Sequence, residues 1–488
     1  MTRLMTALGV ILAITIWLSY QPVIYLGQVS GTNLEISLSQ VGIAIFTLGT
    51  LGFALYKKWL PGRVLALFKT KSGAIINGAI LAYPVFATIS LSWTDNLTRG
   101  LLITVLAWAV AALWFSLALY QQGLLEHNLS EQNLKNYRTF KIIERTGLIA
   151  TIVTGLFALF QLFGDALGVS PALTLLTEPY RYDMFGFARP TGFSAEPEFF
   201  ASILLLPIFY CFYLELRKKG TVLSRLALVL ATTVFFTTIS RGACLALASG
   251  LAVIIAANFR HNLAKISQIL AITAGAFVLA ISLNTFAAAI NTRDAISGPT
   301  ATIMTINQLT LGVFDIPLPA KTAPEPPHKQ KPTNAPKKHK VIKNSQNNGY
   351  VAESTNSRLL MSSKALDLWT ASTRTILFGI GIGSFGVSLH NIYPSASISS
   401  IVNNQFLEVL TETGLIGLIL FITPIIGLAY LAIRRKQWFI LALVVAFSVQ
   451  WCFFSGSINV LHIWVFYGLA AFWLLTTAKN KHLLYNKG

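Results

Sequence analysis

The sequence predicts an all-α, polytopic membrane protein with about twelve transmembrane helices. Of its 488 residues, 54% are hydrophobic and only 11% are charged, whereas soluble chains carry about 25% charged residues. The apolar residues also gather into long runs, and a bilayer core needs roughly 20 apolar residues for each helix. The expected spans lie near residues 4–25, 38–56, 73–93, 100–120, 146–164, 196–216, 222–239, 242–258, 266–286, 403–433, 438–455 and 458–476.

The first apolar run resembles a signal peptide, because Arg3 precedes an apolar core. However, no small-residue cleavage site precedes Gln21-Pro22, and removal of this run would leave an odd number of spans. We therefore expect it to remain as the first transmembrane helix.

Lysine and arginine predict the orientation. With the N-terminus in the cytoplasm, the inner segments hold 22 of the 37 Lys and Arg residues, and the short outer segments hold four, which are Arg99, Arg181, Arg189 and Arg241. The others lie in one long outer loop, which the positive-inside rule exempts. Both termini are thus expected in the cytoplasm. Most of the net charge of +19 reflects topology and attraction to the cytoplasmic leaflet, so nucleic acid is not an expected partner.

Three regions follow from this frame. Residues 1–290 contain the first nine spans, residues 291–402 form a long periplasmic loop, and residues 403–488 contain the last three spans and a cytoplasmic tail. The loop includes a Pro/Lys-rich stretch at about 318–350, with almost no bulky apolar residues. Such a stretch cannot bury enough surface to order itself, so we expect a flexible tether. Binding of an acidic glycan is the less favoured alternative for its lysines.

The rest of the loop is expected to be ordered. In "TNSRLLMSSKALDLW", Asn356 and Ser357 are cap residues, and Leu359, Leu366 and Trp369 fall near helical spacing, which predicts an amphipathic outer helix. The glycines of the next stretch, "ILFGIGIGSFGVSLHN", are spaced like a dinucleotide fingerprint, but no βαβ unit surrounds them. We expect a sharp turn instead, where the backbone passes close to a neighbour and delivers His390 to the membrane surface.

Charged residues stand at the outer ends of two spans. In "FARPTGFSAEPEFFA", Ser194 suits a helix N-cap and Glu196 and Glu198 suit the first turn, which leaves Arg189 unexplained. Arg241 lies between two spans that meet with almost no loop. Each arginine could simply snorkel to the headgroups. Charged groups at membrane depth, however, usually face a cavity or a partner, which makes both arginines functional candidates.

Two arginines and a histidine on the outer face suit transfer from a lipid diphosphate. Arginine binds phosphate through bidentate hydrogen bonds, and a diphosphate leaving group needs its charge held as the bond breaks. His390 can accept a proton near neutral pH. No acidic pair has a convincing metal-site context, so neither a metal nor another cofactor is expected. The expected substrate is a sugar on a lipid diphosphate, attacked by an acceptor hydroxyl.

Five motifs occur in this order within the twelve-span frame: "RPTGFSAEPEFFA", "TTISRGACLA", "NSRLLMSSKALDLW", "FGIGIGSFGVSLHN" and "NNQFLEVLTETGLIGLILF". This set, from about Arg189 to Phe421, resembles the bacterial O-antigen ligase/O-antigen polymerase family. The resemblance implies an inverting, metal-independent glycosyltransferase of the GT-C type, located in the inner membrane with its active site facing the periplasm. Its implied partners are an undecaprenyl-diphosphate-linked glycan donor, a glycan or lipid A-core acceptor, and membrane lipids.

The resemblance also assigns roles to residues. Arg189 and Arg241 match the diphosphate-binding arginines, and His390 matches the loop histidine proposed as the catalytic base. Arg358, which opens the loop helix, and Glu196, in the Glu-Pro motif, are candidates for substrate contact or structural support. The Glu-Pro form of this motif favours a polymerase over a ligase, since ligases more often carry Asn in that region. The tether is a departure that matches no motif of the family.

A polytopic transporter or flippase of an anionic lipid-linked substrate is the alternative class. Transporters tend to show two related halves with a binding site at the bilayer midplane. The sequence has no second copy of "ISRGA" or "GIGIGSFG", and the candidate residues gather at one face. These observations favour the enzyme. His462, near the outer end of the last span, is expected to be a packing histidine.

Overall fold

The computed structural model describes residues 2–29, 32–126, 133–177, 180–181, 185–260, 262–291, 298–310, 316, 349–456 and 460–476. Most of the predicted tether, residues 318–348, therefore lies outside the described residues. Apart from one small hairpin, the described elements are helices.

Eight of the described helices are long and apolar enough to cross a membrane. They are α2 (Leu38–Tyr56), α4 (Lys71–Ser90), α5 (Leu97–Glu126), α6 (Asn133–Ala166), α8 (Pro197–Leu216), α10 (Arg241–Asn258), α11 (Leu263–Ile290) and α16 (Gln405–Arg434). Four shorter apolar helices are α1 (Thr2–Thr15), α9 (Val222–Thr237), α17 (Trp438–Trp451) and α18 (Leu461–Thr476). Within the described chain, these segments correspond one to one with the predicted spans. The expectation of an all-α, polytopic membrane protein is thus confirmed.

The first span differs from its predicted range. α1 ends at Thr15, and the apolar run continues as an antiparallel hairpin of β1 (Val23–Val29) and β2 (Thr32–Ser37). Hydropathy alone cannot tell a short apolar strand from a helix, which is why the prediction ran on to residue 25. The chain before the hairpin docks on the segment that precedes α8, because the N–H groups of Tyr20 and Gln21 both donate to the carbonyl of Phe193.

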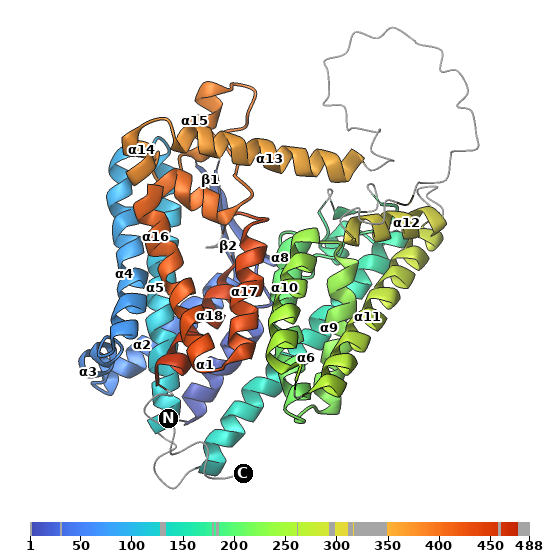
Figure 1. Cartoon of the computed structure of the whole chain (residues 1–488), viewed down its shortest axis with the longest axis horizontal. Helices are drawn as coiled ribbons and strands as arrows, with labels where there is room; N and C mark the ends of the chain where they lie inside the picture. Colours follow the sequence, from blue (N-terminus) through green and yellow to red (C-terminus); the bar gives the residue numbers. More distant parts are fainter. Residues whose placement is uncertain are drawn as a thin grey trace.

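Most of the spanning helices run roughly parallel, and the ordered loop elements gather at one end of them (Figure 1). These elements are α12 (Gly298–Leu309), α13 (Gly349–Trp369), α14 (Thr373–Phe378) and α15 (Phe385–Ile392). Figure 1 shows α13 lying across this end, nearly perpendicular to the spanning helices. α1 begins at the opposite end. We call the end that carries α13 the loop end.

α13 occupies the position of the expected amphipathic helix, but its buried face is not the expected one. Ala365 and Leu368 are buried, whereas Leu359 and Leu366 are exposed. The small Ala365 lets α13 approach α16, since the carbonyl of Ala365 accepts a hydrogen bond from the Thr411 hydroxyl at 3.2 Å. Leucine spacing alone could not show which side of the helix meets the rest of the protein.

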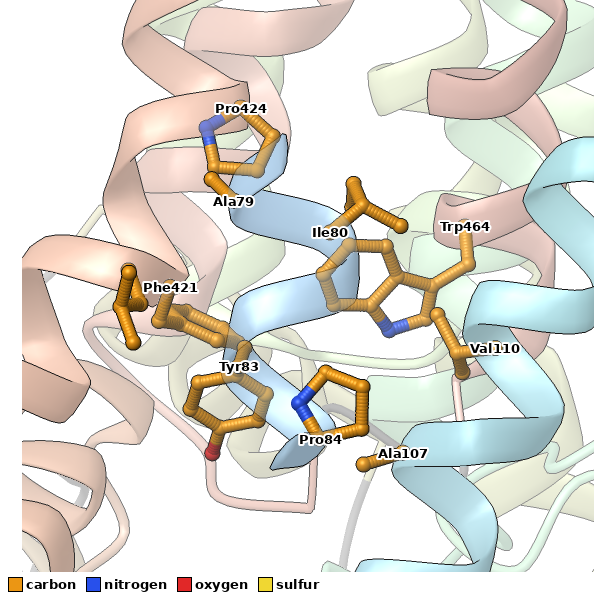
Figure 2. Close-up of a pocket in the computed structure, with 10 residues that line it drawn as sticks. Ala79, Ile80, Tyr83, Pro84, Ala107, Val110, Phe421, Pro424 and Trp464 are labelled. Carbon is orange, nitrogen blue, oxygen red and sulfur yellow. The ribbon is translucent and has the colours of Figure 1, made fainter. Parts of the chain in front are cut away.

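A small apolar pocket lies among α4, α5, α16 and α18 (Figure 2). Its volume is about 30 Å³, and its lining includes Tyr83, Pro84, Phe421, Pro424 and Trp464. A cavity of this size has room for about two water molecules. It is therefore a packing defect beside two proline-containing helices, too small to hold a lipid chain.

Candidate functional site

The turn between α9 and α10 presents Arg241 at the loop end. Ile239 has a φ of 52°, which is strained for a β-branched residue. The next residue, Ser240, caps α10 by accepting a hydrogen bond from the Ala243 N–H at 3.4 Å. Arg241 is then the first residue of α10 and is partly buried. The tight turn holds the backbone of Arg241 in one defined position.

Arg189 packs against this turn. Its Nε donates to the carbonyl of Thr238 at 3.0 Å, and its Nη2 donates to the carbonyl of Ile239 at 3.4 Å. These carbonyls follow the last residue of α9, where a cation is favourable because of the helix dipole. The guanidinium also lies 6.0 Å from the ring centroid of Tyr180. The structure thus brings Arg189 to the turn that begins α10 with Arg241.

The acidic residues of "SAEPEFF" lie beside these arginines. The expectation that Ser194 caps α8 is wrong, because Glu196 is the N-cap and Pro197 is the first helical residue. Proline fixes the φ angle that starts a helix, and this places the boundary two residues later. Ser194 instead shares a hydrogen bond with the hydroxyl of Ser19 at 2.8 Å, which joins it to the chain before the hairpin.

Glu198 forms an ion pair that the sequence did not suggest. Its Oε2 lies 3.1 Å from Nη2 of Arg358, on α13. Glu198 is 8% exposed, and its main-chain carbonyl accepts a hydrogen bond from the Gln450 side chain at 3.2 Å. The pair connects the loop helix to the start of α8, a spanning helix, at the loop end. Its partners are 160 residues apart in sequence, so no local pattern could have revealed it.

The pKa of Glu196 responds to the charges of two neighbouring arginines. The residue is exposed to solvent, yet desolvation of the carboxyl group by its neighbours raises its pKa. The charges of Arg189 and Arg358, together with a hydrogen bond from Tyr180, act in the opposite direction and lower this pKa. Both arginines therefore lie within electrostatic reach of one carboxylate. The cluster of Arg189, Glu196, Glu198, Arg241 and Arg358 is called the arginine cluster below.

His390 lies near the end of α15, outside the arginine cluster. Its Nδ1 is 2.7 Å from the carbonyl oxygen of Ala396. A carbonyl can only accept, so Nδ1 carries the proton, and Nε2 of the neutral ring is left as the acceptor. In the described part of the chain, this hydrogen bond joins His390 to its own loop rather than to an arginine. A base that accepts a proton through Nε2 has this tautomer.

The glycine loop, residues 379–384, positions α15. Gly379, Gly381 and Gly383 have φ angles of 73°, 106° and 78°, which glycine adopts without strain. The loop passes so close to the chain around Thr94 and Gly100 that a Cβ at Gly381 or Gly383 would lie 2.6 Å from main-chain atoms there. A side chain at either position would collide with backbone.

A carboxylate binds main-chain amides at this loop. Oε2 of Glu412 accepts from the N–H of Gly383 at 2.8 Å, and Oε1 accepts from the N–H of Phe385 at 3.2 Å. On the same helix, Glu408 lies 3.6 Å from Nη2 of Arg99. Sequence reasoning assigned no role to these three charged residues. Glu412 and Glu408 stand in the "EVLTETG" motif, and Arg99 was one of only four basic residues in short outer segments, which were the available signals.

The remaining polar candidates are structural. His462 is buried, and its Nε2 shares a hydrogen bond with the Ser202 hydroxyl at 2.8 Å. This agrees with its expected packing role. Among the described residues, no group of three or more His, Cys, Asp or Glu side chains is arranged to hold a metal ion.

Comparison with protein families matches residues 226–422 to the O-antigen ligase family. Comparison with curated proteins gives no match. The matched segment contains Arg241, Arg358, His390 and Glu412, while Arg189 and Glu196 precede it. Over residues 226–422 this multi-pass membrane protein therefore contains an O-antigen ligase family domain, which implies lipid-linked glycan transfer of the ligase or polymerase type.

Proposed function

We propose that the protein transfers a glycan from an undecaprenyl-diphosphate carrier to an acceptor hydroxyl at the periplasmic face of the inner membrane. The observation that carries this proposal is the docking of Arg189 on the turn that begins α10 with Arg241. With Arg358 close by, three arginines lie in the arginine cluster beside two glutamates. Planar guanidinium groups suit a diphosphate in geometry as well as charge.

The chemistry is a single displacement. The acceptor oxygen attacks the anomeric carbon, the bond from that carbon to the diphosphate oxygen breaks, and the configuration inverts. The acceptor proton passes to Nε2 of His390, which the hydrogen bond from Nδ1 to Ala396 leaves as the accepting atom. The arginines hold the charge that develops on the leaving diphosphate. Because they provide this positive charge, we propose that the transfer proceeds without a metal ion.

Orientation follows from the charges. Lys58, Lys218 and Lys436 are the second residues after the ends of α2, α8 and α16, at the end of the molecule away from α13, and each has a φ of 55° or 56°. The positive-inside rule places this lysine-rich end in the cytoplasm. Both termini are then cytoplasmic, and the arginine cluster and His390 face the periplasm.

The acceptor separates the two forms of the reaction. A polymerase adds the glycan to a second lipid-linked glycan, and a ligase adds it to lipid A-core. The Glu196-Pro197 form of the α8 motif favours the polymerase. The test is to incubate the purified protein in detergent with a lipid-diphosphate glycan and either lipid A-core or a second donor molecule. We expect a lengthened lipid-linked glycan with the second donor; a lipid A-core product alone would identify a ligase.

Two arginine variants test the site itself. Arg241→Lys keeps the charge but loses the planar fork, so we expect transfer to fall by roughly 10²–10³-fold while the protein still inserts. Near-normal turnover of both Arg241→Lys and Arg189→Lys would show that these residues only anchor the protein at the headgroups. Translocation of the lipid-linked glycan without any product would instead support the transporter.

A further inference from the structure

The ion pair between Glu198 and Arg358 is built differently from a purely structural pair. Arg358 comes from the loop helix α13, and its side chain is 34% exposed, whereas that of Glu198 is 11% exposed. One partner is therefore fixed in the protein, and the other remains accessible at the loop end. An arginine held in this way can change partners without unfolding a buried core.

Glu198 is also incompletely satisfied. Its Oε2 binds Arg358, but its Oε1 is buried and has no hydrogen-bond partner within the described residues. This oxygen faces the start of α10, where a Cβ on Gly242 would lie only 2.6 Å away. A buried carboxylate oxygen without a partner loses its hydration and receives no protein donor in return. The ion pair therefore stabilises the fold less than one in which both carboxylate oxygens have donors, and Arg358 is held through only one oxygen of Glu198.

Arg358 is close enough to serve the phosphate site. Its Nη2 lies 3.1 Å from Oε2 of Glu198, and Oε1 of the same carboxylate lies beside Gly242, the residue that follows Arg241. The charges of Arg358 and Arg189 also both lower the pKa of Glu196. A diphosphate there carries more negative charge than one carboxylate and offers oxygens for a bidentate contact. It would therefore compete with Glu198 for Arg358.

We propose that Glu198 is a positioning residue that holds Arg358 beside the empty phosphate site and gives it up to the incoming donor diphosphate. Arg358 then becomes a third arginine on the diphosphate, contributed by the loop helix. When the product diphosphate leaves, Arg358 returns to Glu198. This inference rests on the proposed function, because it assumes that the arginine cluster binds a diphosphate.

The test asks whether Glu198→Gln binds the donor diphosphate more tightly or more weakly than the wild type. The purified full-length protein in detergent is titrated with undecaprenyl diphosphate, and Kd is measured for the wild type and for Glu198→Gln. We call the transfer of Arg358 from Glu198 to the diphosphate the exchange. The exchange predicts that Glu198→Gln binds undecaprenyl diphosphate roughly tenfold more tightly than the wild type, because Arg358 no longer has to leave a carboxylate. If Glu198 merely anchors α13, the same variant binds more weakly, and the proposal is wrong.

A matched control separates exchange from a general change in charge. Glu196→Gln removes the same charge two residues away, where the structure records no ion pair with Arg358 within the described chain. Exchange predicts a clearly smaller effect for Glu196→Gln. It also predicts that Arg358→Gln weakens binding more in the Glu198→Gln background than in the wild type. Equal tightening by both glutamate variants, independent of Arg358, would show a field effect only and overturn the exchange.

Two further outcomes are distinguishable. If the wild type does not bind undecaprenyl diphosphate at all, the proposed function fails, and this inference fails with it. If the wild type binds but Glu198→Gln shows no tightening, only the inference fails. Should Glu198→Gln not purify as a single species, Glu198→Asp replaces it. The shorter side chain lengthens the ion pair, so exchange predicts tighter binding there as well, and unchanged or weaker binding contradicts it.

Discussion

At the scale of single residues, Arg189 and Arg241 contribute differently to the same site. Arg189 binds two carbonyls of the turn, so Arg189→Lys should lower the free energy of unfolding by about 1 kcal/mol for each lost hydrogen bond. The thermal midpoint should fall accordingly, and the rate of transfer should fall as well. Arg241→Lys leaves these two hydrogen bonds in place, so it should lower transfer without the loss of stability that they account for. Thermal unfolding in detergent, measured beside the transfer rate, tests this difference. Equal losses of stability would contradict it.

His390 makes a prediction about pH. A general base contributes typically about 10²–10⁴-fold, so His390→Gln should lower transfer by a factor in that range while donor binding survives. A base works only when it is deprotonated, so the wild-type rate should fall as pH is lowered, and the variant should lose this acidic limb of the profile. Rates measured between about pH 5 and 8 decide the matter. Matching profiles would make His390 a substrate contact only.

Sequence reasoning reached some of these residues and not others, for a physical reason. Arg189, Arg241 and His390 stand out because a charged or polar residue at the end of an apolar run is locally unusual. Glu198 was explained too easily as a first-turn acid, and its pairing with Arg358 depends on the fold. Glu412 had no local signal beyond its motif, since its partners are main-chain N–H groups of a distant loop.

At the scale of elements, the glycine loop is the part most sensitive to substitution. Gly383→Ala requires an alanine at a φ of 78° and places its Cβ against the backbone of Gly100. We expect a loss of roughly 2–5 kcal/mol of stability, or displacement of α15 with loss of transfer. Gly78→Ala on α4 is the matched control, because nothing lies within 4 Å of its Cβ. It should change stability by less than about 1 kcal/mol, in the stabilising direction.

The outcome is read from the thermal midpoint and the transfer rate of both glycine variants. If Gly383→Ala behaves like Gly78→Ala, the loop tolerates a side chain, and it does not hold α15 in a fixed position. The elements also show where pattern reading fails. The hairpin after α1 was missed because an apolar strand of this length satisfies the same hydropathy criterion as a helix.

At the scale of the whole molecule, the sequence predicts the number of spans well because the bilayer imposes it. Every backbone polar group inside the membrane must be satisfied within its own segment, so long apolar runs become helices. The packing of those helices is not constrained in this way. Which end of α8 meets α13, or which face of α13 is buried, depends on side-chain fit between segments that are far apart in the sequence.

Orientation is the last property that the charges predict for the whole molecule. A reporter active only in the cytoplasm should be active when fused after Lys219, Arg260 or Lys479, and silent when fused within residues 320–350. The reason is that the lysine-rich ends of α2, α8 and α16 lie opposite α13, and positive residues are retained on the cytoplasmic side. The reverse pattern would place the arginine cluster and His390 in the cytoplasm. The argument for a lipid-diphosphate donor would then no longer hold, because nucleotide-activated sugars are available on the cytoplasmic side.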